Sequence, residues 1–230
     1  MKILAFDTST HWLSVACGDG AAWATRTEHA GEGSSERLLP LIDAVLADAG
    51  VTLRDLDGIA FGAGPGSFTG VRIACGVAQG LALGAGRPLV AVSTLEALAE
   101  AAWRDRGAVR VVSCLDARMR EVYLAAYERD GDGWRERHAP VVWKPEAVAL
   151  TGVDGWIGAG DGFAAYPALG ATLALSRVDA DAKPDARAIA TLALPRLVAG
   201  EGVAAGAARP LYVRHRVALT TAERAAGQRM

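Results

Sequence analysis

Two stretches of the sequence carry residue types that bind phosphate groups and the metal ions that accompany them. The first is Asp7, which follows the apolar run 3–6. The second is the glycine-rich segment 62–70 (GAGPGSFTG), which lies between a predicted strand at 59–62 and a predicted helix at 71–85. Free backbone N–H groups and the helix dipole at such a position can hold an anion. A carboxylate beside that anion could hold Mg²⁺ through water.

Both stretches also have a purely structural interpretation. The glycine-rich segment has Ser67 where a dinucleotide fingerprint needs its third glycine, and it lacks the Gly-Lys pair of a P-loop. A turn that needs glycine backbone angles, with Ser67 or Thr69 capping the next helix, explains the segment equally well. An Asx turn closed by Thr8 and Ser9 likewise explains Asp7. The candidate residues for a vestigial phosphate site are Asp7, Gly64, Gly66, Ser67 and Gly70.

Residues suited to metal binding or nucleophilic catalysis are scattered. His11, His29, His138 and His215 form no H-x-x-x-H or H-E-x-x-H pair, and no G-x-S-x-G elbow is present. The three cysteines include no C-x-x-C pair, which argues against a disulfide scaffold and favours a reducing compartment. The sequence therefore predicts no metal and no cofactor.

Composition narrows the class of protein further. The chain has 230 residues, of which 51% are hydrophobic, and this is enough to build real cores. Its net charge of −2 lacks the basic excess of a stand-alone nucleic-acid binder, so any RNA contact must be local or shared with a partner. The apolar run before Asp7 is too short for a signal peptide, and no run of about 18 apolar residues follows. We expect a soluble cytoplasmic protein.

The elements that must position these residues follow an α/β pattern that occurs twice. Strand-like segments at 3–7, 12–18 and 22–28 precede a helix at 34–49, and strands and helices then alternate to about residue 106. A new apolar strand at 109–115 ends in Asp116, much as the first strand ends in Asp7. The chain is therefore predicted to be internally duplicated, with related mixed sheets in residues 1–107 and 108–230.

Two helices carry more apolar or small residues than one sheet requires. Gly76, Gly80 and Gly84 share one face of the helix at 71–85, although each costs about 1 kcal/mol relative to alanine. Close approach of another backbone, either the protein's own sheet or a partner helix, would offset that cost. The helix at 34–49 is apolar over a wide arc, so it could serve an intramolecular core or a second subunit. The predicted interface residues are Leu38, Leu41, Ile42, Val45, Gly76, Gly80 and Gly84.

Taken together, these residues resemble the TsaB family, also called YeaZ, of the tRNA threonylcarbamoyladenosine pathway. The resemblance covers nearly the whole chain. It is carried by residues 3–9 (ILAFDTS), 64–73 (GPGSFTGVRI), 116–123 (DARMREVY) and 210–214 (PLYVR). It implies two ribonuclease-H-like halves of the actin and sugar-kinase type, in agreement with the duplication.

The resemblance also implies a function. TsaB is similar to TsaD, the subunit that transfers the threonylcarbamoyl group to N6 of adenosine 37 in tRNAs and that holds a metal with a helical H-x-x-x-H motif. Thr94 and Leu98 stand at the places of those histidines, and neither side chain can replace imidazole as a metal ligand. The implied role is a non-catalytic subunit that binds and activates TsaD together with the ATPase TsaE. It would meet tRNA through the complex and could form a homodimer when isolated.

Two other functions remain open at this point. The chain could be a nucleotide phosphotransferase or hydrolase of the sugar-kinase type that uses Asp7 and the loop 64–70, although no clear general base accompanies them. A metal-dependent peptidase is a weaker alternative, because the histidine spacing does not fit it.

Overall fold

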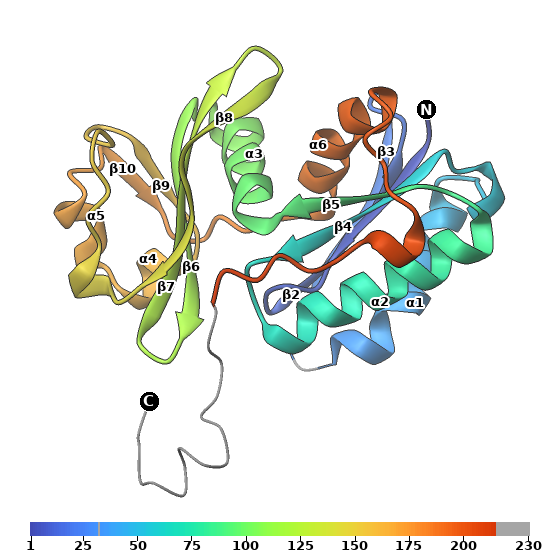
Figure 1. Cartoon of the computed structure of the whole chain (residues 1–230), viewed down its shortest axis with the longest axis horizontal. Coiled ribbons are helices and arrows are strands. Elements are labelled where there is room, and N and C mark those ends of the chain that lie inside the picture. Colours follow the sequence, from blue (N-terminus) through green and yellow to red (C-terminus); the bar gives the residue numbers. More distant parts are fainter. Residues whose placement is uncertain (32, 215–230) are drawn as a thin grey trace, which may run out of the picture.

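The chain folds into two α/β halves that lie side by side (Figure 1). The computed structural model describes residues 1–31 and 33–214. His215 and the end of the extended tail predicted at 209–217 lie outside the described residues.

Each half contains a five-stranded mixed sheet. The first has the order β3-β2-β1-β4-β5, and the second has the order β10-β9-β6-β7-β8. In both sheets a three-strand antiparallel meander is extended by two parallel strands, so the topology repeats. This confirms the predicted fold class. The strands are β1 Ile3–Asp7, β2 Trp12–Gly18, β3 Trp23–His29, β4 Gly58–Gly64, β5 Leu89–Ser93, β6 Arg110–Arg118, β7 Glu121–Asp130, β8 Gly133–Trp143, β9 Ile157–Ala159 and β10 Arg177–Asp179.

The helices cover both faces of the first sheet. Alternation along β1 sends Leu4 and Phe6 toward α1 and α2, and Ile3 and Ala5 toward α6. All four side chains are fully buried, so the first strand reads as a continuous apolar run. The helices are α1 Ser34–Asp48, α2 Phe68–Ala85, α3 Thr94–Arg106, α4 Gly162–Ala165, α5 Ala168–Thr172 and α6 Ala186–Val198, with 3-10 turns at Leu53–Asp55, Pro145–Ala147 and Ala205–Ala207.

The last helix of each half packs against the other half. The α3 helix follows the first sheet, but its Leu95 and Leu98 lie in a core with Val111 and Leu115 of β6. The α6 helix follows the second sheet, yet its Ile189 packs on the first. The halves therefore share packed cores rather than a simple linker.

A buried charge fixes the β7–β8 hairpin to α3. Glu100 is 3% exposed and accepts hydrogen bonds from Arg129 Nη1 at 2.6 Å and from Trp134 Nε1 at 2.8 Å. The Arg129 guanidinium also lies 3.8 Å from the centre of the Trp103 ring. Because the carboxylate is both ion-paired and hydrogen-bonded, its burial is compensated, and the hairpin is held in one position.

The α2 helix is long and apolar enough to cross a membrane by length and composition alone, with a mean hydropathy of 1.3. The expectation that no such stretch follows in the chain was therefore wrong, because aliphatic residues such as Ile73 and Val77 outweigh Arg72 and Gln79 in the average. The buried face of α2 packs against β4 in the first core. Ile73, Val77 and Leu81 pack partly against the same core, whereas Phe68 and Leu83 are exposed.

Candidate functional site in the cleft between the two halves

A cleft of about 720 Å³ lies between the two halves. The first half contributes the turn 8–11 after β1 and the loop 65–70 before α2. The second half contributes the end of β6 with the following turn, together with Asp161. The C-terminal segment 211–214 forms part of the wall as well. Three of the five predicted phosphate-site residues, Gly66, Ser67 and Gly70, line this cleft, whereas Asp7 and Gly64 do not.

Asp7 is held inside the protein rather than presented to the cleft. Ser9 donates a backbone hydrogen bond of 3.0 Å to Oδ1 and a hydroxyl hydrogen bond of 2.9 Å to Oδ2. A Cβ atom at Gly62 would overlap the Asp7 carboxylate and would also approach Ile189 of α6. The Asp7 carboxylate therefore lies on the α6 side of the sheet. Burial raises the pKa of Asp7 to about 6, against the opposing effect of the Ser9 hydrogen bonds. Its oxygens are thus occupied by an Asx-type turn.

The glycine-rich loop packs directly on the turn after β1. The Ser67 N–H donates to the Ser9 carbonyl at 2.7 Å, and the Thr8 hydroxyl donates to the Gly70 carbonyl at 2.7 Å. Side chains at Gly66 and Gly70 would overlap the carbonyl oxygens of Ser9 and Thr8. Ser67 also caps α2 by accepting from the Gly70 N–H at 3.3 Å. This close approach accounts for the two glycines without a bound phosphate.

Thr94 and Leu98, which the family resemblance sets at the places of metal-binding histidines, are core residues. The Thr94 hydroxyl accepts from the Gly64 N–H and donates to Ser9 Oγ, both at 3.2 Å. It thereby joins the first turn of α3 to the loop and to the Asp7 turn. Leu98 is fully buried in the core under the second sheet. Within residues 1–31 and 33–214, no group of three or more His, Cys, Asp and Glu side chains is arranged to hold a metal ion.

The wall of the cleft formed by the second half carries a group of charged residues. The sequence analysis did not predict them as site residues. Asp161 Oδ1 accepts the Asp116 N–H at 3.0 Å, and burial raises the pKa of Asp161. Asp116 pairs with Arg118 at 3.1 Å, and Arg118 contacts His11 of the first half. The duplication, which sets Asp116 on Asp7, was the available signal for this wall.

The residues of the β6–β7 turn adopt an uncommon backbone conformation. Arg118, Met119 and Arg120 have φ values of 60°, 53° and 60°, which is the left-handed region. Non-glycine residues rarely adopt it, and a run of three stores strain that the flanking strand pairing must hold. The turn presents Arg118 to the cleft.

The C-terminal segment 208–214 runs across the groove between the halves (Figure 1). On the first half, the Leu211 N–H donates to Ala63 O at 2.7 Å, and Arg72 lies near the Tyr212 ring at 5.2 Å. On the second half, Arg214 donates to the Ala117 carbonyl at 3.1 Å and pairs with Glu121. We call this segment the C-terminal strap. The PLYVR sequence identified the segment, but not its position across the cleft.

The predicted interface residues fall into two groups. Leu38, Ile42 and Val45 are at most 1% exposed and belong to the core beneath the first sheet, and Leu41 is partly buried. Placing Leu38, Ile42 and Val45 in a subunit contact was therefore wrong, because the sheet uses most of the apolar arc of α1.

The glycines of α2 do face outward. Gly76, Gly80 and Gly84 are exposed, and a Cβ atom built on any of them meets nothing within 4 Å. On the same two helices, Leu39 of α1 is 49% exposed and Leu83 of α2 is 78% exposed. We call the exposed apolar and glycine residues of α1 and α2 the α1–α2 face.

Comparisons with known proteins agree with this architecture. The family described as "TsaD: tRNA N6-adenosine threonylcarbamoyltransferase" matches residues 27–217. The tRNA threonylcarbamoyladenosine biosynthesis protein TsaB of Escherichia coli (strain K12) is 41% identical over 225 residues, covering 95% of this chain and 96% of that protein. The TsaB of Haemophilus influenzae is 42% identical, covering 72% and 74%.

A solved structure described as YeaZ from Pseudomonas aeruginosa is also similar. It is 41% identical, has a TM-score of 0.84 and covers 92% of this chain and 99% of its own. A second structure from that organism, described as similar to peptidase YEAZ, is 40% identical with the same TM-score. The chain therefore belongs to the TsaB family, also called YeaZ, and takes part in tRNA threonylcarbamoyladenosine biosynthesis.

Proposed function

We propose that this chain is a non-catalytic subunit that binds TsaD through the α1–α2 face and, with TsaE, supports threonylcarbamoyl transfer in the cytoplasm. The observation that carries the proposal is the row Gly76, Gly80 and Gly84. Each glycine lies in open space within a helix, where alanine would be more stable by about 1 kcal/mol. Such a row is useful when a second helix approaches closely.

The positions of Asp7 and Thr94 support a non-catalytic role. Asp7 is turned away from the cleft and bound by Ser9, so it is not placed to act as a base. Thr94 is committed to hydrogen bonds with Gly64 and Ser9. In this proposal tRNA is reached through the assembled complex rather than by this chain alone.

Substitution of Gly80 by arginine tests the proposal. Because a side chain at Gly80 meets nothing within 4 Å, the monomer should fold with unchanged or slightly higher stability. A partner helix would no longer approach, so affinity for TsaD should fall at least about tenfold, or 1.4 kcal/mol. The measurement is a titration of purified TsaD, with circular dichroism as the check on folding.

Ala171→Arg is the matched control, because Ala171 is exposed on α5 of the other half. It should leave TsaD binding unchanged. If Gly80→Arg retains affinity within a factor of about two, the contact lies elsewhere on the chain. The same face would serve a homodimer of the isolated chain, so Gly80→Arg should also reduce self-association in sedimentation.

A further inference from the structure

A second cavity, of about 390 Å³, lies between the halves and shares Leu211 and Val213 of the C-terminal strap with the cleft. Ser93 at the end of β5, Glu96 in α3 and Arg196 in α6 form one side of it. Strands β7 and β8 supply the other side. Its volume is within the range of small-molecule sites. We call it the strap pocket.

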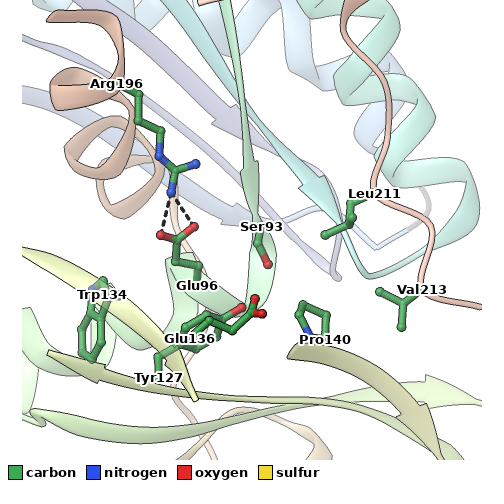
Figure 2. A pocket seen from close by; sticks show the side chains of 9 residues that line it. All are labelled: Ser93, Glu96, Tyr127, Trp134, Glu136, Pro140, Arg196, Leu211 and Val213. Carbon is green, nitrogen blue, oxygen red and sulfur yellow. Dashed lines mark hydrogen bonds and ion pairs between the residues drawn. The ribbon is translucent and has the colours of Figure 1, made fainter. Parts of the chain in front are cut away.

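The charges of the strap pocket do not balance. Arg196 Nη2 donates to both oxygens of Glu96, at 2.6 and 2.7 Å, and this ion pair is half-buried (Figure 2). Glu136 lies opposite Tyr127 in the β7–β8 ladder and has no hydrogen bond or ion pair within the described chain. Its neighbours Arg135 and Arg137 pair instead with Asp130 and Glu128. Glu136 is exposed, so it places one unpaired, solvated carboxylate at the rim of the pocket.

Two hydroxyl groups border the same space. Ser93 Oγ is buried and has no hydrogen-bond partner in the described residues. Burial raises the pKa of the nearby Tyr127 phenol and the adjacent Ser93 hydroxyl lowers it, although the two groups do not meet hydrogen-bond geometry. A buried hydroxyl without a partner is costly, so it is an indication of a missing ligand or water.

The strap pocket is polar on one side and apolar on the other. Figure 2 shows the Ser93 hydroxyl and the Glu136 carboxylate directed toward the centre, with Pro140, Leu211 and Val213 opposite. We propose that the strap pocket binds a primary alkylammonium compound, with its ammonium at Ser93, Tyr127 and Glu136 and its short aliphatic chain against Pro140, Leu211 and Val213.

The hydrogen-bond donors of an ammonium group match the acceptors that line the strap pocket. An ammonium group has three N–H donors and no acceptor, and it would meet one carboxylate and two hydroxyl oxygens. Tyr127 and Trp134 add aromatic surface, which favours a cation. An anion would face Glu136 without a free counter-charge, since Arg196 is already paired with Glu96. A neutral alcohol would form no ion pair with Glu136.

Titration of the full chain with n-butylammonium at neutral pH, followed by amide and indole NMR signals, tests this assignment. We expect saturable shifts at Ser93, Glu136 and the Trp134 indole, with a dissociation constant in the millimolar range or below. The uncharged match, 1-butanol, should bind at least about tenfold more weakly. Glu136→Gln should weaken n-butylammonium binding by a similar factor, and Ser93→Ala by a smaller one.

Glu201→Gln is the matched control, because Glu201 is exposed beyond α6 and has no ion pair in the described residues. It should bind n-butylammonium like the parent chain. Equal binding of 1-butanol, full affinity in Glu136→Gln, or no saturation at about 20 mM would each overturn the proposal. A lysine with both backbone ends blocked carries the same ammonium group. Binding of that compound but not of n-butylammonium would also overturn it, since the pocket would then recognise a protein side chain.

Discussion

Asp7 shows how a carboxylate at the end of a strand can serve the fold instead of a ligand. Its type and position predicted either a phosphate-site residue or an Asx turn, and the two interpretations could not be separated from the sequence. The deciding fact is the direction of the side chain. The Ser9 hydrogen bonds and the contact with Gly62 fix that direction.

Asp7→Asn should therefore stabilise the protein at neutral pH. The pKa of Asp7 is raised in the folded state from 3.8 to about 6, so folding favours the protonated form. The stability that this provides is fully present below about pH 4 and is lost as the pH rises through 6. A two-unit rise corresponds to at most about 3 kcal/mol, and asparagine, which cannot ionise, avoids that loss.

Urea unfolding of both proteins between pH 4 and pH 8 measures this difference. The two curves of unfolding free energy against pH should converge near pH 4, separate between about pH 4 and pH 6, and keep a constant difference above that range. Curves that stay parallel from pH 4 to pH 8 would mean that Asp7 is not buried as described. Isothermal titration of ATP with the parent chain serves as the functional check, and we expect no micromolar binding.

We expect the Thr94 hydroxyl group to contribute to the free energy of unfolding through its hydrogen bond with Gly64. Thr94→Val keeps the shape but removes the hydroxyl that accepts from the buried Gly64 N–H. Leaving such a donor unsatisfied costs about 1 to 3 kcal/mol. Thr94→Ser, which keeps the hydroxyl, is expected to lose less, as measured by denaturant unfolding. Equal losses in the two variants would place the effect in packing rather than in the hydrogen bond.

At the scale of single elements, two adjacent leucines of α1 have different environments. Leu38 is fully buried, whereas Leu39 is 49% exposed. We expect Leu38→Asp to cost about 4 kcal/mol or more, because it buries an unpaired charge. Leu39→Asp should change stability by no more than about 0.5 kcal/mol but weaken TsaD binding.

Thermal unfolding and the TsaD titration, applied to both variants, distinguish these outcomes. A stable Leu38→Asp protein would contradict the burial of α1 on the first sheet. Unchanged TsaD affinity in Leu39→Asp would remove α1 from the proposed contact and leave α2 to be tested alone.

The elements themselves were largely predictable because their signals are local. The helix α1, the loop before α2 and the meander β1 to β3 follow from periodicity, caps and glycines. The face of α1 that remains exposed was not predictable, since several orientations bury a wide apolar arc equally well. The short elements α4, α5 and β10 have too few residues for any periodicity to emerge.

At the scale of the whole molecule, the exchanged helices α3 and α6 make the two halves depend on each other. Their placement could not be predicted, because a helical pattern does not say which sheet it covers. The strap pocket was hidden for the same reason, since its residues come from segments far apart in the chain. The repeat of the strand order, by contrast, follows from the duplicated sequence pattern.

We expect the chain to unfold in a single transition and the fragment 1–107 not to fold alone. Without α6, the face of the first sheet formed by Ile3, Ala5 and Val92 would be open to water. Coincident far-UV and tryptophan transitions in urea would support this coupling. A cooperatively folded 1–107 fragment would show that α6 is dispensable for the first sheet.

The packing of α6 on the first sheet also affects folding during synthesis, because α6 is made long after that sheet. At about 5 to 20 residues per second, roughly 10 to 40 s pass on the ribosome between the synthesis of β1 and that of α6. During that interval the apolar face that α6 will cover has no partner from its own chain. Chaperones that bind apolar segments can act in this interval, and a chain that ends before Ala186 would keep that face exposed.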